Sequence, residues 1–288
     1  MRQLLFLIVS FLFVSCDIIE APYLETPLPS LPADEQCIEL ANASPPFTEP
    51  IVRKVLVEEM TGHKCGNCPE VGELIHTLKI NDFAGEMVVM SIHAGALSTP
   101  SSSGKYTTDF RTSEGNDLYG ELNPFDVVPL GLINREDLIT GPGAYVSKIE
   151  QALNQPAEAG IRIVNCFDAD SATLTTVIDL KYLMDGGEDE RLAVYLVEDQ
   201  VIDWQKDYRL NDPDIQQYTH HDVMRDAVNG VWGEPVSSEP VTAESVYQKA
   251  YTYQLNPGWN PVNCKIVAVV FDHETKIIRQ VEEVPVVN

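Results

Sequence analysis

The stretch Val55–Pro69, VLVEEMTGHKCGNCP, decides the fold. An apolar strand at Val55–Val57 leads into Cys65-Gly66-Asn67-Cys68-Pro69, and a helical pattern follows over Glu70–Lys79. Two thiols separated by two residues can close a small disulfide ring. A helix N-terminus favours a thiolate on the exposed first cysteine, because its dipole and unpaired N–H groups attract negative charge. Pro69 fits the first helical turn, which needs no donor there. The pattern indicates thiol–disulfide exchange.

Outward from this stretch, strand and helix patterns alternate as far as about residue 156. The expected elements are a strand at Met87–Ile92, a helix at Asp109–Leu122, a strand at Gly131–Asn134 and a helix at Ala144–Leu153. Strands separated by helices indicate an α/β layer. A dithiol at the C-terminal end of a strand points to thioredoxin-like architecture. We therefore predict a thioredoxin-like domain over residues 51–156.

A proline before the strand at Gly131–Asn134 supports this domain. The thioredoxin fold places a cis-proline there, facing the dithiol, and Val128-Pro129 occupies that position. The alternative is a trans proline that merely starts the strand, since about 5–6% of X–Pro bonds in folded proteins are cis. We predict that Pro129 is cis and shapes a peptide-binding groove. The polar insertion Ala94–Lys105 would lie near the dithiol, as a lid, as a substrate-contacting loop or simply as a loop.

Charged residues precede the dithiol. Glu59, six residues before Cys65, stands where thioredoxin-like proteins often bury a carboxylate that accepts a proton from the second thiol. Burial would raise the pKa of Glu59 toward neutrality. The alternative is that Glu58 and Glu59 are two solvated acids at a strand end. His63 and Lys64 either lower the pKa of Cys65 through positive charge or are surface residues with no assigned role.

The six cysteines fit an oxidising compartment, where disulfides persist. Cys65 is the predicted attacking thiol, and Cys68 is predicted to resolve the mixed disulfide. The alternatives are an inert structural disulfide and a zinc half-site, and zinc is disfavoured because no second Cys-x-x-Cys completes the site. Cys166 and Cys264, each at an end of a strand-like run, are predicted to pair. Cys37 is then an odd thiol.

The N-terminal residues have the pattern of an export signal: a charged start, an apolar run at Leu4–Val14 and a small-residue cleavage site. The apolar run is too short to span a bilayer, which takes about 20 residues. Because Cys16 follows Ser15 as in a bacterial lipobox, we predict a signal peptide over residues 1–15 and lipidation of Cys16, with plain secretion as the alternative. Residues 16–50 are acidic and rich in proline, which predicts a semi-extended tether.

From residue 157 the pattern changes to strands. Alternate residues of Leu174–Tyr182 share one face, which is the period of a strand. Further strand-like runs lie at Arg191–Val197, Val246–Leu255, Lys265–Phe271 and Ile277–Val287. Several strands separated by polar turns are typical of an antiparallel β-sandwich. We predict an Ig-like β-sandwich domain over residues 157–288.

Composition and the remaining motifs argue against several functions. The net charge of −25 disfavours nucleic acid or an anionic membrane surface as a direct partner, because both would repel the chain. The acidic cluster at residues 185–190 lacks the spacing of an EF-hand. In His220-His221-Asp222, adjacent histidines on a strand point to opposite faces and do not easily share an ion, so we assign them, and the lone His93, structural roles. No metal and no cofactor is predicted.

These motifs together resemble the outer-membrane-protein-28-related lipoproteins of Bacteroidetes-type bacteria. The resemblance rests on Val55–Pro69, Val128-Pro129, His221–Arg225, Val228–Gly230 and Trp232–Glu234. It implies a thioredoxin-like domain followed by a β-sandwich, lipid-anchored at the cell outer membrane and surface-exposed. It supplies no settled activity.

Two functions are open at this point. The first is thiol–disulfide exchange with protein thiols or disulfides of the envelope or the exterior, carried by Cys65, Cys68, Glu59 and Pro129. The second is a noncatalytic surface-binding protein or adhesin that engages an unidentified ligand through the β-sandwich or the insertion, with Cys65–Cys68 as a structural disulfide. The redox direction does not follow from the sequence, because the reduction potential depends on the folded environment of the thiols.

Overall fold

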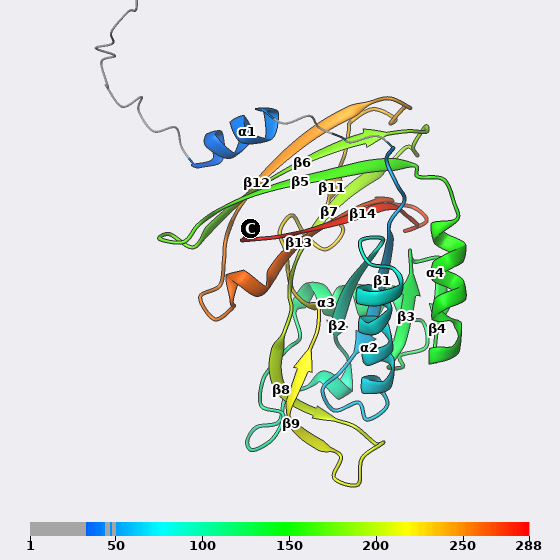
Figure 1. Ribbon diagram of the computed structural model, residues 1–288, viewed down its shortest axis with the longest axis vertical. Helices are drawn as coiled ribbons and strands as arrows, with labels where there is room; N and C mark the ends of the chain where they lie inside the picture. Colours follow the sequence, from blue (N-terminus) through cyan, green and yellow to red (C-terminus); the bar gives the residue numbers. More distant parts are fainter. Residues whose placement is uncertain (1–32, 44–46, 48–49, 288) are drawn as a thin grey trace, which may run out of the picture. The chain divides into compact units, whose positions relative to one another are not determined.

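The strand that precedes the dithiol is an interior strand of a mixed sheet (Figure 1). The computed structural model describes residues 33–43, 47 and 50–287, so the predicted signal peptide and the lipidation site at Cys16 lie outside the described residues. Every residue of β1 (Val55–Thr61) is buried. It pairs in parallel with β2 (Met87–His93) and antiparallel with β3 (Leu130–Ile133), and β3 pairs with β4 (Asp137–Ile139).

Helices cover both faces of these strands. They are α2 (Cys68–Thr77), α3 (Ser113–Leu122) and α4 (Tyr145–Leu153). Alternate residues of a strand point to opposite faces, so Val55 and Val57 pack with α2 and α4, whereas Leu56 packs in a second cluster with α3. The same alternation places Glu59 on the α2 side of the sheet and Glu58 on the α3 side.

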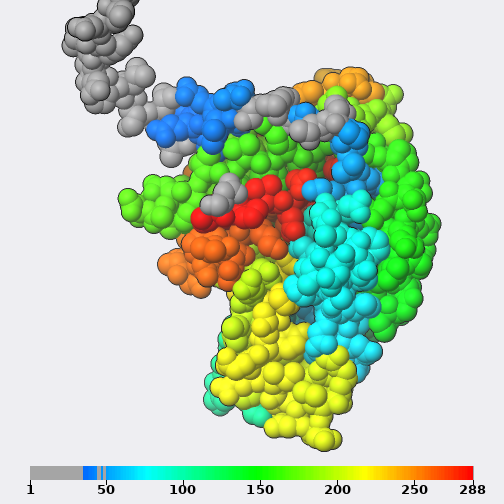
Figure 2. Space-filling model, in the orientation of Figure 1, coloured from blue at the N-terminus to red at the C-terminus, as the bar shows by residue number. Residues whose placement is uncertain are grey.

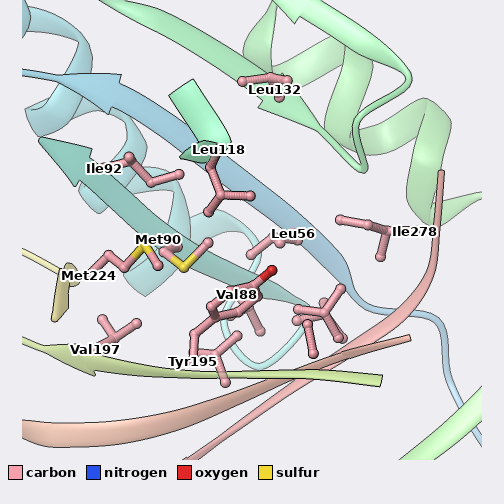
Figure 3. Packing of buried hydrophobic residues seen from close by; sticks show 14 of the residues in the cluster. Leu56, Val88, Met90, Ile92, Leu118, Leu132, Tyr195, Val197, Met224 and Ile278 are labelled. Carbon is pink, nitrogen blue, oxygen red and sulfur yellow. The ribbon is translucent and has the colours of Figure 1, made fainter. Parts of the chain in front are cut away.

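Strands from the C-terminal half extend the same sheet. Its order is β14-β13-β7-β10-β2-β1-β3-β4, with β11 paired to β7. The added strands are β7 (Glu190–Glu198), β10 (Val223–Ala227), β11 (Glu234–Pro235), β13 (Cys264–Asp272) and β14 (Ile278–Pro285). Figure 3 shows Leu56 and Met90 in one cluster with Tyr195 and Val197 of β7. Residues on both sides of position 157 therefore share a sheet and a core.

A second sheet, in the order β12-β6-β5, packs on the other face of β7 and β13. Its strands are β5 (Ala159–Asp168), β6 (Thr173–Tyr182) and β12 (Val246–Gln254). The structure is thus a mixed α/β fold with several sheets. An Ig-like sandwich is not confirmed as a separate unit, because β10 of this segment pairs with β2 of the segment before it. The alternation within residues 157–288 identifies strands but does not identify the strands with which they pair.

The remaining elements are short. β8 (Val201–Lys206) and β9 (Asp214–His220) form a two-stranded hairpin. A π-helical turn follows α2 at Leu78–Asp82, and 3-10 turns lie at Ala96–Ser98, Pro142–Ala144 and Pro261–Asn263. Over the described ranges, the structure contains no helix with the length and apolar character needed to cross a membrane.

The helix α1 (Ala33–Ala43) corrects the prediction of an extended tether for this part of residues 16–50. An isolated helix of this length is marginal in water, but Cys37 anchors it through a disulfide to Cys166 of β5. Cys166 faces α1, whereas Cys264 is a buried free thiol in the cluster between the two sheets. The predicted Cys166–Cys264 pair is therefore wrong, because the Cys166 side chain lies on the outer face of its sheet.

Candidate functional site

The dithiol lies between the end of β1 and the start of α2. Cys65 and Cys68 form a disulfide, as the spacing indicated, and their Cα atoms are 5.4 Å apart. The Cys65 N–H donates to the Gly62 carbonyl at 2.9 Å, and the Cys68 N–H donates to the Cys65 carbonyl at 3.3 Å. Cys68 and Pro69 are the first two residues of α2, so the helix begins two residues earlier than its pattern indicated. A thiolate at such a helix start is stabilised by the helix dipole.

Both cysteines are buried, each with 2% of its surface exposed, so the prediction of an exposed Cys65 is wrong. The β8–β9 hairpin packs on the backbone of the loop that carries them. The Tyr208 N–H donates to the Gly66 carbonyl at 2.8 Å, and the Gln205 amide donates to the Cys65 carbonyl at 3.0 Å across 140 positions of sequence. A methyl group at Gly66 would come within 2.4 Å of the Tyr208 ring. Figure 2 shows the hairpin segment, in yellow, against the α2 segment, in cyan.

Of the two residues just before Cys65, His63 differs from both predicted alternatives. His63 is buried, and its ring stacks on Tyr106 with the centroids 5.5 Å apart. Burial lowers the pKa of His63 to about 4. The imidazole is therefore neutral at neutral pH and does not supply the expected positive charge. The Lys64 N–H donates to the Leu97 carbonyl at 3.0 Å, so the insertion Ala94–Lys105 packs against this loop.

Glu58 and Glu59 are both buried, which contradicts the alternative of two solvated acids. Glu58 forms a bidentate ion pair with Arg135, with 2.9 Å from Nε to Oε2 and 2.6 Å from Nη2 to Oε1. Glu59 pairs with no cation of the described chain; it accepts a hydrogen bond from the Ser91 hydroxyl at 3.1 Å. Burial raises the pKa of Glu59 to about 7, so this carboxyl group exchanges a proton near neutral pH.

A small polar cavity joins Glu59 to Cys68. Its volume is about 30 Å³, and side chains from β1, β2, α2 and the end of β9 line it, among them Glu59, Cys68, Ser91, His93, Tyr218 and His220. Gly72 of α2 lies against the carboxylate, since a methyl group there would be in van der Waals contact with Glu59 Oε1 at 3.4 Å. Glu59 and Cys68 therefore line one space, which is the arrangement that proton transfer between them needs.

Pro129 lies in a groove on another side of the dithiol loop. The Val128–Pro129 peptide bond is cis, as its position indicated. The groove has a volume of about 520 Å³, and Pro129 lines it together with Asn67, the residue that directly precedes Cys68. Phe125 in this groove is 59% exposed. Exposed apolar side chains beside a groove are typical of surfaces that bind another protein or peptide.

The histidine-rich segment at the end of β9 contributes to the polar cavity. His220 and His221 both line it. The His221 ring stacks on His76 of α2 with the centroids 3.6 Å apart, and His221 Nδ1 lies 2.7 Å from Asp199 Oδ1. No group of three or more His, Cys, Asp or Glu side chains is placed to hold a metal ion in the part of the chain that the structure describes.

The sequence alone did not identify His76 or Tyr218 as residues of this cavity, and it indicated only a structural role for His93. A signal for His76 does exist. Cys68, Gly72 and His76 follow one another at spacings of four, which places them on one face of a helix. Tyr218 and His93 lie on strands far apart in sequence, and only the folded chain brings them together.

Comparisons with known proteins point to one family. A family model described as Outer membrane protein Omp28 matches residues 122–288, and no curated protein matches the chain. HBP35 of Porphyromonas gingivalis has a similar structure, with a TM-score of 0.63 at 16% identity over 83% of this chain and 76% of that chain, a likeness that shows the fold alone. A protein from Agrobacterium tumefaciens has a TM-score of 0.49 at 14% identity over 82% and 95% of the two chains. A domain of the outer membrane lipoprotein Omp28 from P. gingivalis has 0.30 at 24% identity over 45% and 88%.

Proposed function

The chain belongs to the outer membrane protein Omp28 family, and from this premise we propose that it is a lipid-anchored protein of the cell outer membrane that exchanges disulfides with envelope or extracellular proteins. Cys65 and Cys68 form the reacting pair, Glu59 exchanges the proton, and Pro129 borders the substrate groove. A strand, a Cys-x-x-Cys helix start and a cis-proline in thioredoxin-like arrangement support the proposal. The proposal also includes lipidation of Cys16 and exposure of the protein at the cell surface.

The observation that carries the proposal is the cavity shared by Glu59 and Cys68. An ionised carboxylate without a cation is costly in a protein interior, by several kcal/mol. A disulfide that only cross-links the chain has no use for such a group. A thiol that must lose its proton does, because a carboxyl group with a pKa of about 7 takes up and releases protons near neutral pH.

The exchange proceeds in two balanced steps. The Cys65 thiolate attacks a substrate disulfide, whose S–S bond breaks, and one substrate sulfur leaves as a thiolate that takes up a proton. The Cys68 thiol then gives its proton to the Glu59 carboxylate, and the Cys68 thiolate attacks the Cys65 sulfur. The mixed disulfide breaks, and the second substrate sulfur leaves, while Cys65 and Cys68 become a disulfide. In the reverse direction the same steps oxidise a substrate dithiol.

Substrate access requires the β8–β9 loop to move. Tyr208 covers Gly66, and both sulfurs are buried beneath the loop. On the side of Pro129, the groove with the exposed Phe125 offers an apolar surface to an extended substrate segment. A substrate lying there contacts Asn67, between the two cysteines, and we propose that it reaches the buried sulfurs only when the loop opens.

The burial of both sulfurs is also the observation that favours a second candidate function. A disulfide with 2% exposure at each cysteine resembles a structural cross-link, which resists reduction. In that case the chain is a noncatalytic surface-binding protein, and its groove or its insertion holds the ligand.

A cysteine substitution separates the two candidates. Cys65→Ser should abolish reduction of a model protein disulfide by the full-length protein, because the attacking sulfur is lost. The matched control is Cys264→Ala, which removes the buried free thiol and should keep the activity. Turnover by Cys65→Ser at the level of the unmodified protein, or no turnover by the unmodified protein under reducing conditions, refutes the exchange function and favours surface binding.

A further inference from the structure

The polar cavity does not end at Glu59; it extends to a histidine that solvent reaches. His76 and His221 line the same cavity as Glu59 and Cys68. The His221 side chain is 29% exposed, so one part of its ring faces the cavity and another part faces the exterior. Glu59 itself is 4% exposed and has no such contact with bulk solvent. A proton that Glu59 takes from Cys68 therefore needs a route out.

The cavity has the size and the polar lining for such a route. A water molecule needs roughly 10–15 Å³ of such space, so a cavity of about 30 Å³ accommodates about two. Buried ring nitrogens also point to hydrogen bonding within it. His76 Nδ1, His220 Nε2 and both ring nitrogens of His93 have no hydrogen-bond partner among the described residues. Buried polar groups are nearly always satisfied, often by ordered water.

The groups around His221 determine which of its ring nitrogens is available for proton transfer. His221 Nδ1 lies 2.7 Å from Asp199 Oδ1, so Nδ1–H donates to this carboxylate and Nε2 stays available. Burial alone would raise the pKa of Asp199, but the hydrogen bond from His221 and the charge of Lys265 lower it, so Asp199 stays ionised. Burial and the neighbouring His221 lower the pKa of His76. The His76 ring of the stacked pair is thus neutral and able to accept a proton.

We propose that the cavity conducts the proton between Glu59 and solvent, and that His221, stacked on His76, is the residue at which the proton leaves and returns. The inference rests on the proposed exchange reaction, and it makes His221 a positioning and proton-relay residue rather than a reacting one. In the resolving step, the proton passes from Cys68 to Glu59, through the cavity to Nε2 of His221, and then to buffer. No electron moves on this route, and Glu59 is returned to its ionised form for the next turnover.

Titratable groups face this route from each element that packs against it. They are Glu59 of β1, His93 of β2, His76 of α2, Lys79 of the π-helical turn, Tyr218 and His220 of β9, Asp222 after it, Asp199 after β7, Lys265 of β13 and Glu283 of β14. Lys79 and Lys265 both donate to Asp222, at 2.9 Å and 2.8 Å. The lysines and carboxylates of this set are paired with one another, and His93 and His220 are buried, which leaves the stacked pair, with the partly exposed His221, as the imidazoles that connect the cavity to solvent.

The test is His221→Gln in the full-length protein, because glutamine keeps a donor for Asp199 and does not titrate. Excess glutathione disulfide oxidises the reduced protein, and acid-quenched samples are alkylated to count free thiols and the mixed disulfide at Cys65. At pH 6 most Glu59 carboxyl groups carry a proton and must release it before they can accept the proton of Cys68. We therefore expect the mixed disulfide to form at the unmodified rate and to resolve at least about fivefold more slowly in dilute buffer, a small part of the roughly 10²–10⁴-fold that general acid–base catalysis contributes. A high concentration of imidazole should restore the rate, because it replaces the lost proton carrier. His273→Gln, on a turn away from the cavity, is the matched control.

The outcomes separate this inference from the function on which it rests. If the unmodified protein forms no mixed disulfide, the exchange function fails. If it exchanges normally and His221→Gln resolves at the same rate, only the proton route fails. A slow variant that imidazole does not restore also overturns the route, because it indicates a structural defect. Unchanged formation of the mixed disulfide shows that the variant is folded with its site intact, and His76→Gln should then give a slower rate as well.

Discussion

Replacing Glu59 by glutamine should change how stability depends on pH. The pKa of Glu59 rises from 4.5 to about 7 in the folded protein because of burial. One pKa unit corresponds to about 1.36 kcal/mol, so ionising the buried carboxyl group costs the folded state about 3 kcal/mol. The folded state keeps this proton up to about pH 7, whereas the unfolded chain releases it near pH 4.5. The contribution of Glu59 to the free energy of unfolding is therefore fully present below pH 4.5 and is lost as the pH rises to about 7.

Glu59→Gln removes the charge and keeps an oxygen that accepts from the Ser91 hydroxyl. We expect the variant to be as stable as the unmodified protein near pH 5 and more stable by up to about 3 kcal/mol near pH 8. Urea unfolding at both pH values, with linear extrapolation, measures the difference. Glu86→Gln, at an exposed glutamate, is the control and should leave the pH dependence unchanged. If Glu59→Gln follows the pH dependence of the unmodified protein, Glu59 is not a buried acid of raised pKa, and the reasoning fails.

Two further substitutions test the surroundings of the site. Arg135→Leu leaves the buried Glu58 carboxylate unpaired, so it should lower the free energy of unfolding by about 3–5 kcal/mol in urea titrations; a loss below about 1 kcal/mol would contradict the buried ion pair. Gly66→Ala places a methyl group 2.4 Å from the Tyr208 ring and should push the β8–β9 loop away. Alkylation of reduced Cys65 should then become about tenfold faster, equivalent to about 1.4 kcal/mol of weaker loop closure, whereas an unchanged rate would show that the loop does not limit access.

The local chemistry of the site was predictable from one short stretch and one proline. The strand at Val55, the two-residue spacing of Cys65 and Cys68, and the cis bond before Pro129 all follow from local pattern and position. The position of Glu59 before the dithiol also indicated a proton acceptor, but its burial stayed open against two solvated acids until the structure placed it on the face of Val55 and Val57, which the helix that carries Cys68 covers. Short-range geometry is enough in each of these cases.

Long-range pairing was not predictable. A period of two identifies β10 as a strand but does not reveal that Val223 pairs with Ser91 of β2, which is what fuses the two halves into one sheet. The same limit explains the cysteines. The position of Cys166 near a strand end gave no indication that its side chain faces α1 and Cys37. Cys65 is packed against strand β8, whose Gln205 lies 140 residues later, and no pattern around the dithiol contains this contact.

The most direct test of a redox role is the reduction potential of the Cys65–Cys68 disulfide in the folded, full-length protein. The protein is equilibrated with glutathione buffers of graded composition, and free thiols are trapped and assigned to Cys65 and Cys68. We expect a potential between roughly −120 and −270 mV, the range of known exchange catalysts, with both thiols trapped while the protein stays folded. A potential below about −300 mV, or thiols that react only after unfolding, would mark a structural disulfide and contradict the proposed exchange.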